Sequence, residues 1–166
     1  PTTAQHVAEG LGDKIDMILD GGACAVGVES TIIDLTGKNI VLLRAGGTAK
    51  EDIEAFTGEK VLLSEGNPEL PSAPGQLLRH YAPHNLLRIN VNTPEDDEFF
   101  IGFGTISGNL NLSPCGDLKE AASNLFAYLR LADAQALHGK IAVAPIPSNG
   151  LGLAINDRLK RASYQK

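Results

Sequence analysis

The side chains best suited to bind a ligand in this sequence are Ser30, which closes a glycine-rich stretch, and Arg44, which closes an apolar run. Residues 21–30 read GGACAVGVES, so small residues precede the hydroxyl pair formed by Ser30 and Thr31. Small residues let a ligand approach the backbone, and a hydroxyl at a strand edge can hold a carboxylate or phosphate oxygen. A tight turn between core strands is the alternative explanation of these glycines.

Arg44 lies between the apolar residues 41–43 and the sequence Ala45-Gly46-Gly47. This order predicts a guanidinium at a strand end, beside a loop that opens a helix. Such a position suits an anion, because the fork of N–H donors and the helix N-terminus both favour negative charge. A surface salt bridge is the alternative role for Arg44.

Residues 65–85, EGNPELPSAPGQLLRHYAPHN, hold four of the nine prolines and predict an ordered linker. Proline removes a backbone donor and restricts the residue before it, so this stretch cannot form a regular helix or a central strand. Its sequence Arg79-His80-Tyr81 joins a cation, an imidazole and an aromatic ring, which can stack on a nucleotide and pair with its phosphates. A linker anchored by Tyr81 is the structural alternative.

The composition of the sequence argues against several classes of protein. Two cysteines exclude a disulfide scaffold, and a formal net charge of −6 argues against a protein that binds nucleic acid mainly by electrostatic attraction. The four histidines lack metal-ligand spacing, so we predict no metal site, and we interpret Cys24 as an inert small residue. No apolar run approaches the ~20 residues of a membrane span and no signal segment opens the chain, so we expect a cytoplasmic protein.

The patterns before residue 65 predict a mixed α+β unit of short elements. Thr48 and Glu51 have the spacing of a capping box, and Thr2 or Thr3 can cap the first helix. The predicted elements are helices over 4–11 and 49–56 and strands over 15–20, 30–35, 40–43 and 60–63, with a hairpin between the second and third strands.

After residue 85, strand and helix patterns alternate, which predicts a small three-layer α/β unit. Asp117 and Glu120 are expected to cap its long helix, and we interpret Gly150 and Gly152 as a structural strand-to-helix turn rather than a dinucleotide fingerprint. The predicted elements are strands over 86–91, 99–103 and 141–146, a solvated acidic loop over 95–98, a helix over 118–129 and a last helix over 153–164. Four basic residues are expected on a solvated face of that last helix, namely Arg158, Lys160, Arg161 and Lys166.

Three segments together resemble one family, the long form of threonylcarbamoyl-AMP synthase in the YrdC-like superfamily. They are residues 27–31 (GVEST), 42–46 (LLRAG) and 73–83 (APGQLLRHYAP), and residues 109–159 resemble that family's extra C-terminal domain. The resemblance implies a fold in three parts. They are a truncated YrdC-like α+β catalytic domain over 1–64, an ordered linker over 65–85 and a Rossmann-like three-layer α/β domain over 86–166.

The resemblance also implies an enzyme, a nucleotidyltransferase that condenses L-threonine, bicarbonate and ATP into threonylcarbamoyl-adenylate and pyrophosphate. This is the first step of the t6A modification of tRNA. Ser30 matches the family's serine that contacts L-threonine, and Arg44 matches its arginine that contacts ATP. The family linker closes over the site, which makes Tyr81 and His80 further candidates for ATP binding. Mg²⁺ is expected to accompany ATP, the downstream tRNA-modification machinery is an expected partner, and no membrane or DNA partner is expected.

The sequence departs from the family at several positions. Ala45 replaces a proline, and Gln76, Leu77 and Leu78 replace the linker's methionine, lysine and tyrosine. The family's basic nucleotide-binding segment and Ser-x-Asn motif have no counterpart after Pro1, so we expect an incomplete, inactive fragment. Two other functions stay open, a non-catalytic nucleotide-sensing or regulatory module and a tRNA-binding accessory that uses the basic last helix.

Overall fold

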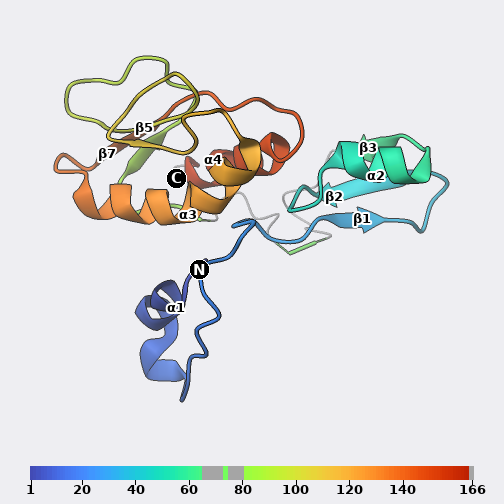
Figure 1. Ribbon diagram of the computed structural model, residues 1–166, viewed down its shortest axis with the longest axis horizontal. Coiled ribbons are helices and arrows are strands. Elements are labelled where there is room, and N and C mark those ends of the chain that lie inside the picture. Colours follow the sequence, from blue (N-terminus) through green and yellow to red (C-terminus); the bar gives the residue numbers. More distant parts are fainter. Residues whose placement is uncertain (65–72, 75–80, 165–166) are drawn as a thin grey trace.

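The computed structural model describes residues 1–64, 73–74 and 81–164, whose strands form two separate sheets (Figure 1). One sheet precedes the predicted linker and the other follows it, while α1 lies away from both. The elements are α1 (Ala4–Leu11), a 3₁₀ turn (Gly12–Lys14), β1 (Ile32–Asp34), β2 (Ile40–Arg44), α2 (Lys50–Thr57), β3 (Val61–Leu63), β4 (Leu86–Arg88), β5 (Phe99–Gly102), β6 (Leu110–Asn111), α3 (Leu118–Gln135), β7 (Lys140–Val143) and α4 (Gly152–Ala162).

The first sheet has the strand order β1-β2-β3 and combines a hairpin with one parallel crossover. β1 runs antiparallel to β2, and Asp34 supports the turn between them by accepting a hydrogen bond from the Thr36 N–H at 2.8 Å. β2 pairs in parallel with β3 after the chain passes through α2. That helix ends at Gly58, whose φ of 71° is a left-handed conformation that glycine adopts without strain. The predicted hairpin, helix and following strand are confirmed.

The predicted capping box of Thr48 and Glu51 is wrong. Helix α2 begins at Lys50, and its N-cap Ala49 makes no side-chain hydrogen bond. The Thr31 hydroxyl instead serves both backbone groups of Thr48, donating to its carbonyl oxygen at 2.6 Å and accepting from its N–H at 3.1 Å. A contact between distant parts of the chain therefore replaces the local one.

The predicted buried strand over 15–20 is also wrong. The run is irregular, and its side chains Met17 and Leu19 are 75% and 87% exposed. An apolar run becomes a strand only when a neighbour supplies hydrogen bonds and covers one face. In the described part of the chain, both sheets are built without this run.

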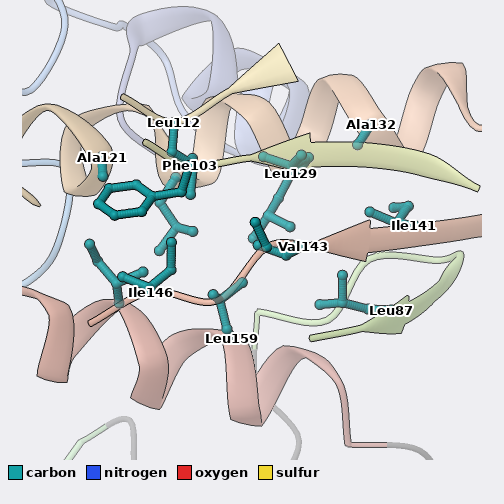
Figure 2. Close-up of a cluster of buried hydrophobic side chains, with 14 of the residues drawn as sticks. Leu87, Phe103, Leu112, Ala121, Leu129, Ala132, Ile141, Val143, Ile146 and Leu159 are labelled. Atoms are coloured by element: carbon teal, nitrogen blue, oxygen red, sulfur yellow. The ribbon is translucent and has the colours of Figure 1, made fainter. Parts of the chain in front are cut away.

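The second sheet has the order β4-β7-β5-β6, and all of its strand pairs are parallel. Consecutive residues of β5 and β7 are buried, so both faces of the sheet are covered. Leu129 of α3 and Leu159 of α4 lie in the same core as Val143 of β7 (Figure 2). The predicted alternation of strands and helices is confirmed. Strand β6 was not predicted, because its two residues carry no periodic pattern.

Local signals at both helices of this unit behave as predicted except at Glu120. Its carboxylate accepts from the Ser113 hydroxyl, and the Asp117 N–H donates to Ser113 Oγ rather than to Glu120. The Asp117 carboxylate begins α3 by accepting from the N–H groups of Lys119 at 2.6 Å and Glu120 at 3.3 Å. A Cβ on Gly152 would lie 1.8 Å from the Pro147 carbonyl oxygen, so glycine is required where the chain enters α4. The structural interpretation of that glycine is therefore confirmed.

The acidic loop over 95–98 is not wholly solvated as expected. The Glu98 side chain is only 1% exposed and accepts hydrogen bonds from Arg88 Nε at 2.6 Å and Nη2 at 2.8 Å. This pairing with β4 turns the end of the loop toward the sheet. None of the described helices combines the length and apolar character that crossing a bilayer requires.

Candidate anion-binding site

Ser30 and Arg44, the two candidate binding residues, lie in direct contact. The hairpin register places Arg44 opposite Ile32, the first residue of β1, and its side chain reaches Ser30, two residues before that strand. Arg44 Nη2 donates to the Ser30 carbonyl oxygen at 2.9 Å and to its hydroxyl at 3.3 Å, and Nε donates to the same carbonyl at 3.2 Å. The pairing of two strands therefore brings a guanidinium and a hydroxyl together at the carboxyl end of β2, the central strand of the sheet.

The charge of Arg44 has no carboxylate partner within residues 1–64, 73–74 and 81–164. Its remaining hydrogen bond runs from Nη1 to the Pro74 carbonyl oxygen at 3.1 Å, so every described acceptor is neutral. The surface salt bridge considered for Arg44 is not formed among these residues. A guanidinium that is not neutralised by a neighbouring carboxylate attracts anionic ligands such as phosphates or carboxylates.

Gly46 lets the loop after β2 press against the segment that carries Ser30. A Cβ on Gly46 would lie 2.3 Å from the Glu29 carbonyl oxygen, closer than side chains allow. The next residue, Gly47, donates its N–H to that same oxygen at 2.8 Å. The two glycines after Arg44 therefore hold the two site segments together.

The glycine-rich stretch divides into an open part and a packed part. Nothing lies within 4 Å of a Cβ added at Gly21 or Gly22, whereas a Cβ on Gly27 would lie 2.2 Å from the Ala122 carbonyl oxygen of α3. Gly27 also has a φ of 74°, which favours glycine. The segment before Ser30 therefore packs directly on the unit that follows the linker.

Glu29 is the residue where both units and the end of the linker meet. The Tyr81 hydroxyl donates to Glu29 Oε1, and Arg158 of α4 donates to Oε2 from Nε at 3.0 Å and from Nη2 at 2.8 Å. The Tyr81 ring lies 5.1 Å from the Phe126 ring and 5.6 Å from the Arg158 guanidinium carbon, within range of a cation–π contact. These contacts anchor the end of the predicted linker, as the structural alternative for Tyr81 proposed.

The pKa values of this cluster are displaced in opposite directions. Burial alone would raise the pKa of Glu29, but hydrogen bonds from Tyr81 and Arg158 outweigh it and lower that pKa to about 2. Burial and the hydrogen bond to Glu29 raise the pKa of Tyr81 to about 12. Glu29 is therefore an anion and Tyr81 a neutral donor throughout the physiological pH range.

Sequence reasoning missed Glu29 and misplaced Arg158. Arg158 was expected on a solvated face of the last helix, but it is fully buried beside Ile155 and Leu159 on the apolar face of α4. Its neighbour on the helix, Arg161, pairs with Asp157 at 2.9 Å. An arginine at an apolar position of an amphipathic helix is the signal that could have identified a buried guanidinium with an acidic partner.

A cavity of about 960 Å³ lies beside this cluster. Residues 24–29 and 81–84 line it together with Phe126 and Arg130 of α3. Glu29 and Tyr81 are thus on its wall, whereas Ser30 and Arg44 are not among the lining residues. In the part of the chain that the structure describes, no group of three His, Cys, Asp or Glu residues is arranged to hold a metal ion. The candidate His80 lies outside the described residues.

The fold and the site define a class of protein. It is an α/β protein of two packed units, with an arginine suited to bind an anion at the end of the central strand of its first sheet. Residues 48–163 match the family described as "Threonylcarbamoyl-AMP synthase, C-terminal domain", and residues 1–46 match the family described as "Telomere recombination". The chain belongs to the family of the threonylcarbamoyl-AMP synthase C-terminal domain, which confirms the resemblance seen in the sequence motifs.

Curated relatives carry the same family name. The threonylcarbamoyl-AMP synthases of Pyrococcus abyssi, Bacillus subtilis and Schizosaccharomyces pombe are 39%, 36% and 31% identical to the chain, and each match covers 98% of it. The same matches cover 54%, 53% and 48% of those relatives. The chain therefore spans about half the length of the curated relatives it matches.

Solved structures confirm the mixed α/β architecture. The crystal structure of P. abyssi Sua5 complexed with L-threonine is similar with a TM-score of 0.82 at 34% identity, covering 98% of this chain and 54% of that one. A variant of the same protein, in which a histidine and the tyrosine after it are replaced by alanine, gives a TM-score of 0.79 at 32% identity. That second match covers 98% of this chain and 53% of the variant.

Proposed function

We propose that the protein carrying this chain is a threonylcarbamoyl-AMP synthase. It would condense L-threonine, bicarbonate and ATP into threonylcarbamoyl-adenylate and pyrophosphate, the step that begins t6A modification of tRNA. The observation that carries the proposal is the contact of Arg44 with Ser30, in which a guanidinium without a described carboxylate partner lies against a hydroxyl. Family membership and similarity to a relative complexed with L-threonine support the same activity.

The roles of the two residues follow from the charges of the substrates. Arg44 would pair with phosphate oxygens of ATP, and the Ser30 hydroxyl would hydrogen-bond L-threonine. The reaction joins the threonine nitrogen to the bicarbonate carbon with loss of water, and a carbamate oxygen then attacks the α-phosphorus as pyrophosphate leaves. Charge stabilisation and positioning serve such a displacement, and these are what a guanidinium and a hydroxyl supply. Mg²⁺ would accompany ATP, held mainly by phosphate oxygens and water.

Tyr81 and His80 would complete the nucleotide side of the site. Tyr81 hydrogen-bonds Glu29, the residue before Ser30, which supports a location near the reacting groups. His80-Tyr81 is the only histidine-tyrosine pair in the sequence, and such a pair is replaced in the P. abyssi variant. The two side chains would therefore act where the linker meets the Ser30 segment.

The decisive measurement is threonine-dependent release of pyrophosphate from ATP and bicarbonate. It uses the product of the complete reading frame that encodes this sequence, compared with the 166-residue chain alone. We expect the first to release pyrophosphate only when threonine is present. Release that is absent, or that does not depend on threonine, contradicts the proposal. ATP-analogue binding without turnover would favour the nucleotide-sensing alternative.

The tRNA-binding accessory is less well supported by the geometry. The last helix, which would supply the basic surface, pairs the buried Arg158 with Glu29 and pairs Arg161 with Asp157. Neither guanidinium is therefore presented as an unpaired cation for phosphates. Binding of tRNA that weakens steeply with salt would restore that alternative.

A further inference from the structure

Arg158 is a fully buried cation that lies outside the candidate site formed by Ser30 and Arg44. It lies on α4 of the second unit with 0% of its side chain exposed, flanked by core residues of that helix. A buried guanidinium is retained only when its donors are satisfied, because removing the charge from water is costly. The partners of Arg158 therefore show what this position does.

The partners of Arg158 come from both segments of the candidate site. Nε and Nη2 donate to Glu29 Oε2 at 3.0 and 2.8 Å, and Nη1 donates to the Ala45 carbonyl oxygen at 3.0 Å. Nη1 also donates to Asp157 on its own helix at 2.7 Å. One rigid planar group thus bridges two loops of the first unit, which a lysine could not do with the same geometry.

The two bridged residues are the immediate neighbours of the candidate binding residues. Glu29 precedes Ser30, and Ala45 follows Arg44. The loops also touch each other directly, since Gly47 donates to the Glu29 carbonyl oxygen and Arg44 donates to that of Ser30. A shift of either neighbour would move the serine hydroxyl and the arginine guanidinium relative to one another.

We propose that Arg158 is a positioning residue of the reaction, which makes the second unit part of the site by holding the Ser30 and Arg44 segments in place through Glu29 and Ala45. It touches no substrate in this role. The kinetic consequence of this role rests on the proposed function. Its structural consequence, that Arg158 keeps the Ser30 and Arg44 segments ordered, does not depend on that function.

The test compares Arg158→Met and Arg158→Lys with Lys160→Met in the product of the complete reading frame. Lys160 is the matched control, because it is an exposed cation on the same helix. We expect Arg158→Met to raise the KM for threonine or ATP at least fivefold, Arg158→Lys to recover part of that loss, and Lys160→Met to change neither. Unchanged KM values in a folded Arg158→Met protein, beside an active unsubstituted protein, overturn the proposal.

Hydrogen exchange gives a readout that does not depend on activity. We expect Arg158→Met to speed amide exchange at least tenfold in residues 28–31 and 45–48, with β5 and β7 unchanged. Should Arg158→Met fail to fold, Glu29→Gln removes the charge partner while keeping the side-chain shape, and the same local increase is expected. If the unsubstituted protein releases no pyrophosphate, the proposed function fails. Separately, amide exchange in residues 28–31 and 45–48 that is the same in the variant as in the unsubstituted protein overturns the positioning role.

Discussion

The Tyr81 hydroxyl donates a hydrogen bond to Glu29 Oε1, joining two residues that are 52 positions apart in the chain. Glu29 precedes the candidate serine, and Tyr81 lies near the end of the predicted linker. Because Arg158 binds the other carboxylate oxygen, one side chain receives contacts from the linker and from the second unit. The candidate site is thus built on an anion held between two parts of the molecule that follow it in sequence.

Removing only the Tyr81 hydroxyl tests this junction. Tyr81→Phe keeps the ring against Phe126 but removes a hydrogen bond to a carboxylate, so we expect a loss of about 1.5–3 kcal/mol in the free energy of unfolding. Urea unfolding measures the loss, and Tyr164→Phe on an exposed tyrosine serves as the control. Equal unfolding free energies for Tyr81→Phe and the unsubstituted chain would contradict the role given to this hydroxyl.

Replacing the candidate binding residues tests the site. We expect Arg44→Ala to lower kcat/KM for ATP at least tenfold, which corresponds to about 1.4 kcal/mol, because the cation proposed to pair with the ATP phosphates is lost. Ser30→Ala should act mainly on the KM for threonine. Pyrophosphate release by the complete reading-frame product measures both. Lys38→Ala, on an exposed lysine of the hairpin turn, should leave the rates unchanged, and rates equally unchanged in Arg44→Ala would exclude this assignment.

The pH dependence of stability tests the charge of Glu29. Its folded-state pKa is lowered from 4.5 to about 2, so the folded state favours the ionised carboxylate. Stability from this group is therefore fully present above pH 4.5 and is lost as the pH falls toward about 2. We expect Glu29→Gln to flatten the stability profile in that window. Thermal unfolding of the Glu29→Gln and unsubstituted proteins, measured from pH 6 to pH 2.5, tests this expectation. Stability profiles that stay parallel for the two proteins count against the ion pair of Glu29 with Arg158.

The close approach of the two site loops is tested at Gly46. A methyl group there would meet backbone atoms of Glu29, Ser30 and Thr31 at 2.3–2.4 Å, so Gly46→Ala must displace one loop. We expect a loss of about 1–3 kcal/mol in stability and a fall in any activity that depends on Ser30. Gly37→Ala, in the turn between β1 and β2, is the matched control, because nothing lies within 4 Å of its added Cβ. Equal melting temperatures for the two variants would show that the loops are not tightly packed.

The sequence by itself determined the elements whose signals are local. The apolar runs flanking residues 36–39 specify the hairpin, and Asp117 specifies the start of α3, because a turn or a cap is satisfied within a few residues. Arg44 and Ser30 could be selected for the same reason, since each ends or precedes a strand whose pattern is visible. The hairpin then brings them together, so their contact follows from a local pairing.

Only the tertiary structure decided the contacts that join distant segments. Thr31 replaces the expected capping box at Thr48, and Met17 and Leu19 are exposed despite the apolar pattern of residues 15–20. Glu29 and Arg158, 129 positions apart, form an ion pair that no periodicity relates, in which the guanidinium is fully buried. From the sequence alone, a charged side chain is expected to be exposed to solvent, because burial requires a partner of opposite charge. The packing of whole units determines whether such a partner is present.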